Sequence, residues 1–177
     1  MWVLNPNSGM LSQILSTIGI NTPGWFTDPN WTKPAVIMMS LWMVGTSTVL
    51  YLAALQNVPQ ELHESAMLDG ANFLQRTIRI IIPLVSPVTL FMFITGIIDA
   101  LQIFTPVYVM AGDNTLGSPE GSLLFFVLYL FQNGFNYMKM GYASAMALVM
   151  FIALVLLTLV IVRTSSSWVY YEGGRRQ

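Results

Sequence analysis

Long apolar runs alternate along this chain with shorter polar segments. Three of the runs are long enough to cross a bilayer as helices: residues 34–56, 80–104 and 141–162. An α-helix rises about 1.5 Å per residue, so about 20 apolar residues cover a hydrocarbon core of about 30 Å. The pattern therefore predicts an all-α, polytopic helical membrane protein with about three full spans.

Two further apolar stretches are too short to span. Residues 123–131 read LLFFVLYLF, and residues 10–20 are weakly amphipathic. Short apolar segments of this kind are typical of re-entrant or interfacial helices. Runs of Pro, Gly, Asn and Asp at residues 21–25, 28–30 and 111–122 interrupt regular structure. We therefore expect short re-entrant or interfacial helices beside the spans, with turns between them.

The composition agrees with a membrane protein and narrows its chemistry. Charged residues make up 8% of the 177 residues, against about 25% in an ordinary soluble domain. The net charge of −1 gives no reason to expect nucleic acid binding. Cysteine is absent and His63 is the single histidine, so neither a zinc site nor a catalytic triad is supported. We expect no metal and no cofactor.

The basic residues predict the orientation in the membrane. With three spans, residues 57–79 and 163–177 share one side, and residues 1–33 and 105–140 share the other. Five arginines lie on the first side and two lysines on the second: Arg76, Arg79, Arg163, Arg175 and Arg176, against Lys33 and Lys139. The positive-inside rule then places residues 57–79 and the C-terminus in the cytoplasm.

Residues 57–79 form the polar connection between the first two spans. Asn57 is a plausible N-cap, and Pro59 falls in the first turn of the helix that follows. That helix is expected to run to about Leu68. Gly70 is well placed to end it in a left-handed conformation. The connection is therefore predicted to be a helical hairpin.

The second helix of this hairpin is expected to follow Asp69 as its cap and to enter the membrane near Pro83. A helix of about ten residues is marginal alone in water, so the hairpin needs support from this protein or from a partner. Two interpretations remain open at this point. The hairpin is either a solvated loop, which composition alone favours, or a docking element inserted into another subunit.

The spacing of residues 64–83 matches a known pattern. Glu64, Ser65 and Ala66 are followed after three residues by Gly70, and nine residues later by residues 80–83, Ile-Ile-Ile-Pro. This arrangement resembles the EAA loop of bacterial ABC importer permeases, which reads Glu-Ala-Ala, three residues, Gly, nine residues, Ile, any residue, Leu, Pro. Ser65 replaces the first Ala and an Ile replaces Leu, and both replacements are close in size.

The wider sequence resembles the carbohydrate-uptake class of these permeases, which imports sugars and also glycerol phosphate. The similarity includes residues 53–71, Pro87, Gln102 with Phe104, and residues 140–147, and it extends over nearly the whole chain. Permeases of this class usually have further spans before the region similar to WVLNPNSGM. The chain is therefore expected to correspond to the C-terminal part of an ABC importer (type I) permease fold.

The resemblance implies a subunit of an ATP-driven importer in the bacterial inner membrane, with no catalysis of its own. The implied partners are cytosolic ATP-binding subunits, a second permease that is commonly a different chain, and an extracytoplasmic solute-binding protein. In the family, the helix that begins the EAA loop sits in a cleft on the ATP-binding subunit and transmits its closure. The residues expected to couple in this way are Glu61, Glu64, Ser65, Ala66, Asp69, Gly70 and Pro83.

Asp99 is the one charged residue inside a predicted span, near its outer end. A carboxylate at mid-bilayer costs about 2.5–3.5 kcal/mol, and the cost falls toward the surface. With Gln102, Asp99 is a candidate for lining the solute path, because both side chains hydrogen-bond hydroxyls; helix packing and an interfacial position are the alternatives. A membrane-embedded enzyme would need a convergent catalytic set, which Asp99 alone is not. A structural subunit of a membrane complex is the remaining interpretation.

Overall fold

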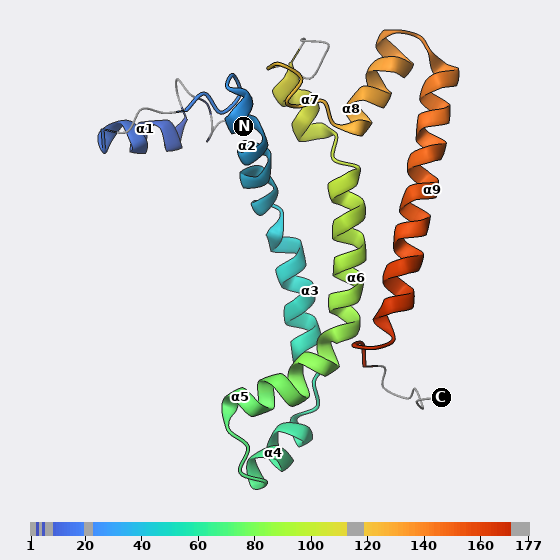
Figure 1. Cartoon of the computed structure of the whole chain (residues 1–177). Coiled ribbons are helices and arrows are strands. Elements are labelled where there is room, and N and C mark those ends of the chain that lie inside the picture. Colours follow the sequence, from blue (N-terminus) through green and yellow to red (C-terminus); the bar gives the residue numbers. More distant parts are fainter. Residues whose placement is uncertain (1–2, 4, 6–8, 20–22, 113–118, 171–177) are drawn as a thin grey trace. The chain divides into compact units, whose positions relative to one another are not determined.

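The computed structural model describes residues 3, 5, 9–19, 23–112 and 119–170, and the regular elements in this part of the chain are helices (Figure 1). In chain order they are α1 (Met10–Thr17), α2 (Pro29–Leu41), α3 (Val44–Gln56), α4 (Gln60–Leu68), α5 (Phe73–Arg76), η2 (Thr77–Ile81), α6 (Ile82–Leu101), α7 (Thr105–Ala111), α8 (Phe126–Phe131), η3 (Gln132–Asn136) and α9 (Met140–Ser165). The elements η2 and η3 are π-helical. The all-α prediction is confirmed.

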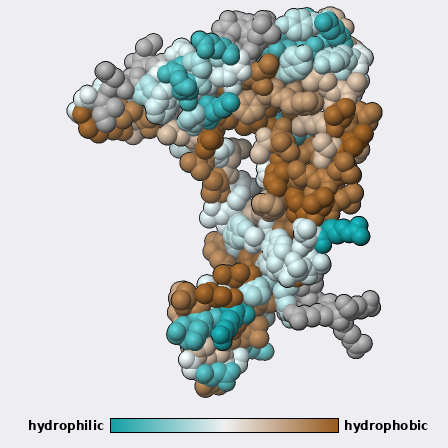
Figure 2. All heavy atoms as spheres, in the orientation of Figure 1, coloured by the Kyte–Doolittle hydropathy of each residue, from teal (hydrophilic) through white to brown (hydrophobic). Residues whose placement is uncertain are grey.

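Three helical stretches in the described residues are long and apolar enough to cross a membrane: Pro29–Gln56, Phe73–Ala111 and Met140–Ser165. This confirms the predicted number of spans. Few of their side chains are buried within the structure, and Figure 2 shows hydrophobic residues over much of the visible surface of α9. Side chains of this kind are stable in contact with lipid tails or with other apolar helices.

The first span is not the uninterrupted helix that was predicted for residues 34–56. The α-helical pattern breaks at Trp42 and Met43, whose N–H groups bond to carbonyls three residues earlier, so α2 and α3 are separate helices. The span also begins earlier than predicted, because Asp28 caps α2. The carboxylate of Asp28 accepts a hydrogen bond of 2.9 Å from the N–H of Asn30, as an N-cap residue does.

The second span contains a proline that the helix accommodates. Pro87 has no N–H to bond the carbonyl of Pro83, four residues earlier. The hydroxyl of Ser86 donates to that carbonyl instead, over 2.6 Å. The helix α6 then ends at Leu101, earlier than the predicted residue 104, and α7 follows after a short break. The prediction also began this α-helical span at Ile80. Ile80 and Ile81 instead belong to the π-helical element η2.

The chain divides into two compact units, and the break in the first span lies at their boundary. The first unit comprises residues 1–43 and 99–151, and the second comprises residues 44–98 and 152–177. The helices α6 and α9 contribute to both units. Each unit has its own internal packing.

The core of the first unit lies where α2 packs against α7. Its buried members come from α2, α7 and the segments beside them: Trp25, Ala35, Val36, Val107, Met110, Ala111, Leu123 and Leu128. The fully buried hydroxyl of Thr32 is hydrogen-bonded to Ser122 over 2.9 Å. This bond joins α2 to the segment before α8 across 90 residues of sequence. Residues 113–118, in the turn-rich loop that was predicted here, lie outside the described residues.

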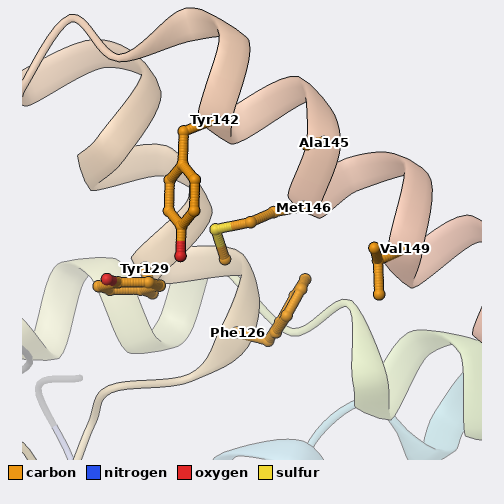
Figure 3. A pocket seen from close by; sticks show the side chains of 6 residues that line it. All are labelled: Phe126, Tyr129, Tyr142, Ala145, Met146 and Val149. Atoms are coloured by element: carbon orange, nitrogen blue, oxygen red, sulfur yellow. The ribbon is translucent and has the colours of Figure 1, made fainter.

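The predicted short helix at residues 123–131 is present as α8, and η3 continues it toward α9. Gly134 permits close packing there, because a Cβ at this position would lie 3.2 Å from the Cβ of Ala143. The backbone N–H of Lys139 donates to the carbonyl of Asn133 over 2.8 Å, which closes the turn. These contacts place α8 and the first half of α9 side by side within the first unit (Figure 3).

Candidate functional site: the polar hairpin and the exposed polar pair

The first helix of the hairpin, α4, begins one residue after Pro59, which is its N-cap. The prediction that Asn57 caps this helix was wrong. A cap at Asn57 would require Val58 to be helical, and a residue that precedes proline disfavours the helical region. Glu61 lies in the first turn, as predicted, where the positive end of the helix dipole favours a carboxylate.

The end of α4 depends on Gly70. The N–H of Gly70 donates to the carbonyl of Met67 over 3.0 Å, and the N–H of Ala71 donates to the carbonyl of Ala66 over 2.9 Å. This pair of bonds is a Schellman motif, which needs a left-handed residue after the helix. Gly70 has φ of +75°, and a Cβ built on it would meet nothing within 4 Å. The predicted left-handed end is therefore confirmed, and glycine is favoured there by the backbone angle and not by a lack of space.

The second helix of the hairpin, α5, is capped by Asn72 and not by Asp69 as predicted. The side chain of Asn72 accepts from the N–H of Gln75 over 2.9 Å, and the side chain of Gln75 accepts from the N–H of Asn72 over 3.0 Å. A capping residue must directly precede the first helical residue. The left-handed turn uses Gly70 and Ala71, so Asp69 is too far back, and it stays exposed.

Six of the seven residues predicted to couple lie together on α4 and the turn that follows it, whereas Pro83 is the second residue of α6. The carboxylate of Glu64 accepts a hydrogen bond from the side-chain amide of Gln60 over 2.9 Å. The hydroxyl of Ser65 donates to the carbonyl of Leu62 over 3.2 Å. Ala66 is the one buried residue of α4. The two glutamates are exposed, so the helix presents an acidic side.

The hairpin also exposes large apolar side chains at its turn, and we call these the exposed apolar group: Met67, Leu68, Phe73 and Leu74. Leu68 is 89% exposed and Phe73 is 74% exposed. Figure 2 shows hydrophobic and hydrophilic residues next to one another on this hairpin. None of these four side chains was among the residues that the sequence predicts to couple.

The polar pair Asp99 and Gln102 lies in the first unit, at the end of α6 and directly after it. The two residues are three apart, which is a neighbouring spacing on a helical turn. Both are exposed, and within the described part of the chain neither forms a hydrogen bond with its side chain. No group of three or more His, Cys, Asp or Glu residues that could hold a metal ion occurs among the described residues.

A pocket of about 430 Å³ lies in the first unit between α8 and α9 (Figure 3). Its lining residues are Phe126, Tyr129, Tyr142, Ala145, Met146 and Val149. The ring of Tyr142 points toward Tyr129 (Figure 3). The other walls are aromatic and aliphatic, so this pocket suits an apolar group. Sequence reasoning offered no sign of it, because its residues come from two helices whose packing the pattern does not reveal.

Comparison with known proteins identifies the family. Residues 2–169 match the family described as binding-protein-dependent transport system inner membrane component. A probable ABC transporter permease protein, YesP of Bacillus subtilis, is 40% identical over 94% of this chain and 53% of its own length. The sulfoquinovosyl glycerol transport system permease protein SmoG of Agrobacterium fabrum is 32% identical over 92% of this chain and 52% of its own length.

The arabinooligosaccharides transport system permease protein AraP of Bacillus subtilis is similar as well, at 31% identity over 91% of this chain and 51% of its own length. The chain thus spans about half the length of the curated relatives it matches. The fold is also similar to one in the crystal structure of a bacterial ABC transporter involved in the import of alginate. That match has a TM-score of 0.80 and 23% identity, over 94% of this chain and 57% of the other.

The three apolar spans, the EAA-like hairpin and these matches agree. They confirm the resemblance to ABC importer permeases of the carbohydrate class, whose members are transport components, and they fit a multi-pass protein of the inner membrane. The chain belongs to the family of binding-protein-dependent transport system inner membrane components.

Proposed function

We propose that this chain forms part of the membrane permease of an ATP-driven importer for sugars or related solutes. The names of two relatives support the solute class, since SmoG is named for sulfoquinovosyl glycerol and AraP for arabinooligosaccharides. In this proposal the chain contributes to the solute path and receives the force of ATP hydrolysis through residues 57–79. The ATP is hydrolysed in a separate cytosolic subunit.

The exposed apolar group on the hairpin is the observation that carries this proposal. Large exposed apolar patches on an otherwise polar element are typical of interaction sites. Leu68, the most exposed of these side chains, is adjacent to Asp69 and lies on the same helix as two exposed glutamates. A loop that is merely solvated has no need of such residues. The hairpin is therefore better explained as a docking element than as a solvated loop.

The partner in this proposal is a cytosolic ATP-binding subunit. Residues 57–79 and the C-terminus then lie in the cytoplasm, as the arginine distribution predicts; two of the arginines in that argument, Arg175 and Arg176, lie outside the described residues. The acidic side of α4, with Asp69 beyond it, supplies ionic contacts, and the exposed apolar group fills a complementary surface. A second permease subunit and an extracytoplasmic solute-binding protein complete the importer.

The hairpin is built to transmit displacement. The Schellman motif at Gly70 and the capping box at Asn72 fix the angle between α4 and α5. The helix α5 continues through η2 into α6 without an intervening loop. The turn between α4 and α5 is held by these bonds, and α5, η2 and α6 are continuous. A force on α4 therefore acts on the membrane-spanning helix. Pro83, at the start of α6, lies where this force would enter the span.

This function can be tested by reconstitution. The chain is expressed with the ATP-binding subunits, second permease and solute-binding protein of its source cell, and the assembly is placed in lipid vesicles. Solute-loaded binding protein is expected to stimulate ATP hydrolysis several-fold, with arabinooligosaccharides and sulfoquinovosyl glycerol as the first solutes. Neither a membrane-embedded enzyme nor a structural subunit predicts this stimulation. Hydrolysis that no solute or binding protein changes would contradict the proposal.

The polar pair provides a separate prediction about the solute path. Replacement of Asp99 or Gln102 by alanine removes one or two hydrogen bonds to solute hydroxyls, each of about 0.5–1.5 kcal/mol. We expect the KM for uptake to rise about three- to tenfold while the amount of protein in the membrane stays the same. Glu120→Gln is the control, since Glu120 is an exposed carboxylate elsewhere in the first unit. An unchanged KM in both alanine variants would place the pair outside the path.

A further inference from the structure

A second pocket, of about 300 Å³, lies within the second unit. Three separate segments form its wall. They contribute Leu62 of α4, residues 79, 80, 83 and 84 of the continuous stretch of η2 and α6, and Tyr170 after α9. The hairpin, the start of a span and the segment after the last span therefore meet at one cavity. Its lining residues with polar side chains are Arg79 and Tyr170.

A specific bond holds the wall formed by Tyr170. Its backbone N–H donates to the hydroxyl of Ser86 over 2.9 Å, and that hydroxyl in turn donates to the carbonyl of Pro83. The carbonyl is free to accept because Pro87 has no N–H. Val169 is buried next to Tyr170. The chain after α9 is thus attached to the first turns of α6, so the pocket is a consequence of the fold.

The guanidinium of Arg79 has no ionic partner among the residues that the structure describes. Within the described residues, Arg79 forms no ion pair and no hydrogen bond with its side chain. Arg76, one turn earlier, has its Nε buried without a hydrogen-bond partner in the described structure. A guanidinium beside apolar walls attracts an anion, and its planar fork binds phosphate through two parallel hydrogen bonds.

The position of the pocket indicates where such a phosphate comes from. Arg79 directly precedes the apolar residues of α6, and its neighbours Ile78 and Ile82 are exposed apolar side chains. Trp168 and Tyr170 are exposed aromatic residues just beyond the end of α9. The end of a span that lies at the depth of the lipid headgroups typically carries a cation, exposed aliphatic side chains and amphipathic aromatic residues.

We propose that this pocket binds the phosphate of an anionic phospholipid, with Arg79 as its ligand, the Tyr170 hydroxyl as a second donor, and Leu62 and Leu84 against the apolar part of the lipid. This lipid site does not depend on the coupling role of the hairpin. Because the pocket joins α4 to α6, a bound headgroup also stiffens the junction between hairpin and span. Only that consequence for coupling rests on the proposed function.

Native mass spectrometry of the purified chain in detergent tests the site. The chain is titrated with an equimolar mixture of phosphatidylglycerol and phosphatidylcholine, and we expect a clear preference for phosphatidylglycerol. Since a hydrogen bond between a guanidinium and a phosphate contributes a factor of about ten in affinity, Arg79→Gln should weaken phosphatidylglycerol binding by about tenfold. Arg163→Gln is the matched control, because Arg163 is an exposed arginine of the same unit that does not line the pocket. Arg163→Gln should change binding less than twofold, because Arg163 does not line the pocket and makes no contact with a lipid bound there.

Two further variants keep the test valid if Arg79→Gln does not fold, as judged by helix content in circular dichroism. Arg79→Lys keeps the charge but loses the fork, and Tyr170→Phe keeps the ring and the backbone N–H but loses the hydroxyl. Each should weaken binding about twofold, as loss of part of a hydrogen-bonded contact does. Equal losses in Arg79→Gln and Arg163→Gln, or no preference for phosphatidylglycerol, would overturn the proposal. Displacement of the lipid by millimolar inorganic phosphate alone would overturn it as well, because the pocket would then be a site for free phosphate.

Discussion

Replacement of Gly70 by valine is expected to reduce stimulated ATP hydrolysis and solute uptake by tenfold or more. Gly70 has φ of +75°, a conformation that costs an ordinary L-residue about 1–2 kcal/mol and a β-branched one more. Valine would avoid that cost by opening the turn, which breaks the two bonds that end α4. The hairpin would then absorb displacement that it now transmits.

The matched control is Gly70→Asn, because asparagine tolerates the left-handed region. A Cβ built at this position meets nothing within 4 Å, so the two variants differ mainly in backbone strain. Hydrogen exchange should speed up at the amides of residues 60–76 in the valine variant and remain near normal in the asparagine variant. Normal uptake and normal stimulated hydrolysis in Gly70→Val would show that the rigid turn is not needed for coupling.

Introduction of a charge at Leu68 is expected to break the contact with the ATP-binding subunit. Leu68 is 89% exposed, so Leu68→Asp leaves the packing of this chain unchanged. If the side chain is a central contact of the docking surface, its loss costs about 2 kcal/mol or more, which is about a 30-fold loss of affinity. The affinity can be measured by titrating the detergent-solubilised permease with the ATP-binding subunit.

Met138→Asp is the control for this prediction. Met138 is also a largely exposed apolar residue, at 76%, but it lies before α9 in the segment predicted to face the other side of the membrane. The same substitution there should leave the affinity within about twofold of the unchanged protein, because exposed sites away from an interface contribute little. Equal affinities for the two variants would mean that the exposed apolar group is not a docking surface.

The spans could be predicted from the sequence because length and apolarity alone decide whether a helix can cross a bilayer. Their limits could not. The first span begins at a cap, Asp28, that lies outside the apolar run, and it breaks at Trp42 with no proline there. The end of α6 at Leu101 likewise lies inside the predicted run, which continues through Gln102 to Phe104.

The hairpin shows which local signals are strong. Gly70 could be identified because a left-handed residue strongly favours glycine. The cap of α5 was assigned to Asp69 when Asn72 holds it, because both side chains can cap and the choice depends on how many residues the turn uses. The Schellman motif uses Gly70 and Ala71, and this geometry cannot be read from composition.

The two pockets could not be predicted because they depend on contacts between distant residues. Tyr170 reaches Ser86 across 84 residues of sequence, and no periodicity links those positions. The aromatic pocket in the first unit likewise combines α8 with α9. Arg79 was counted in the orientation argument as a charge, and only the fold shows that it lines a cavity.

A crosslink from the tip of the hairpin tests the central claim most directly. The chain has no cysteine, so Leu68→Cys introduces a single thiol to which a maleimide–benzophenone reagent can be attached in the intact assembly. Illumination should join this position to a protein whose peptides identify it as an ATP-binding subunit, and the same reagent on Met138→Cys should not. The account predicts that adduct; an assembly that imports solute while the Leu68 probe never captures the ATP-binding subunit would contradict it.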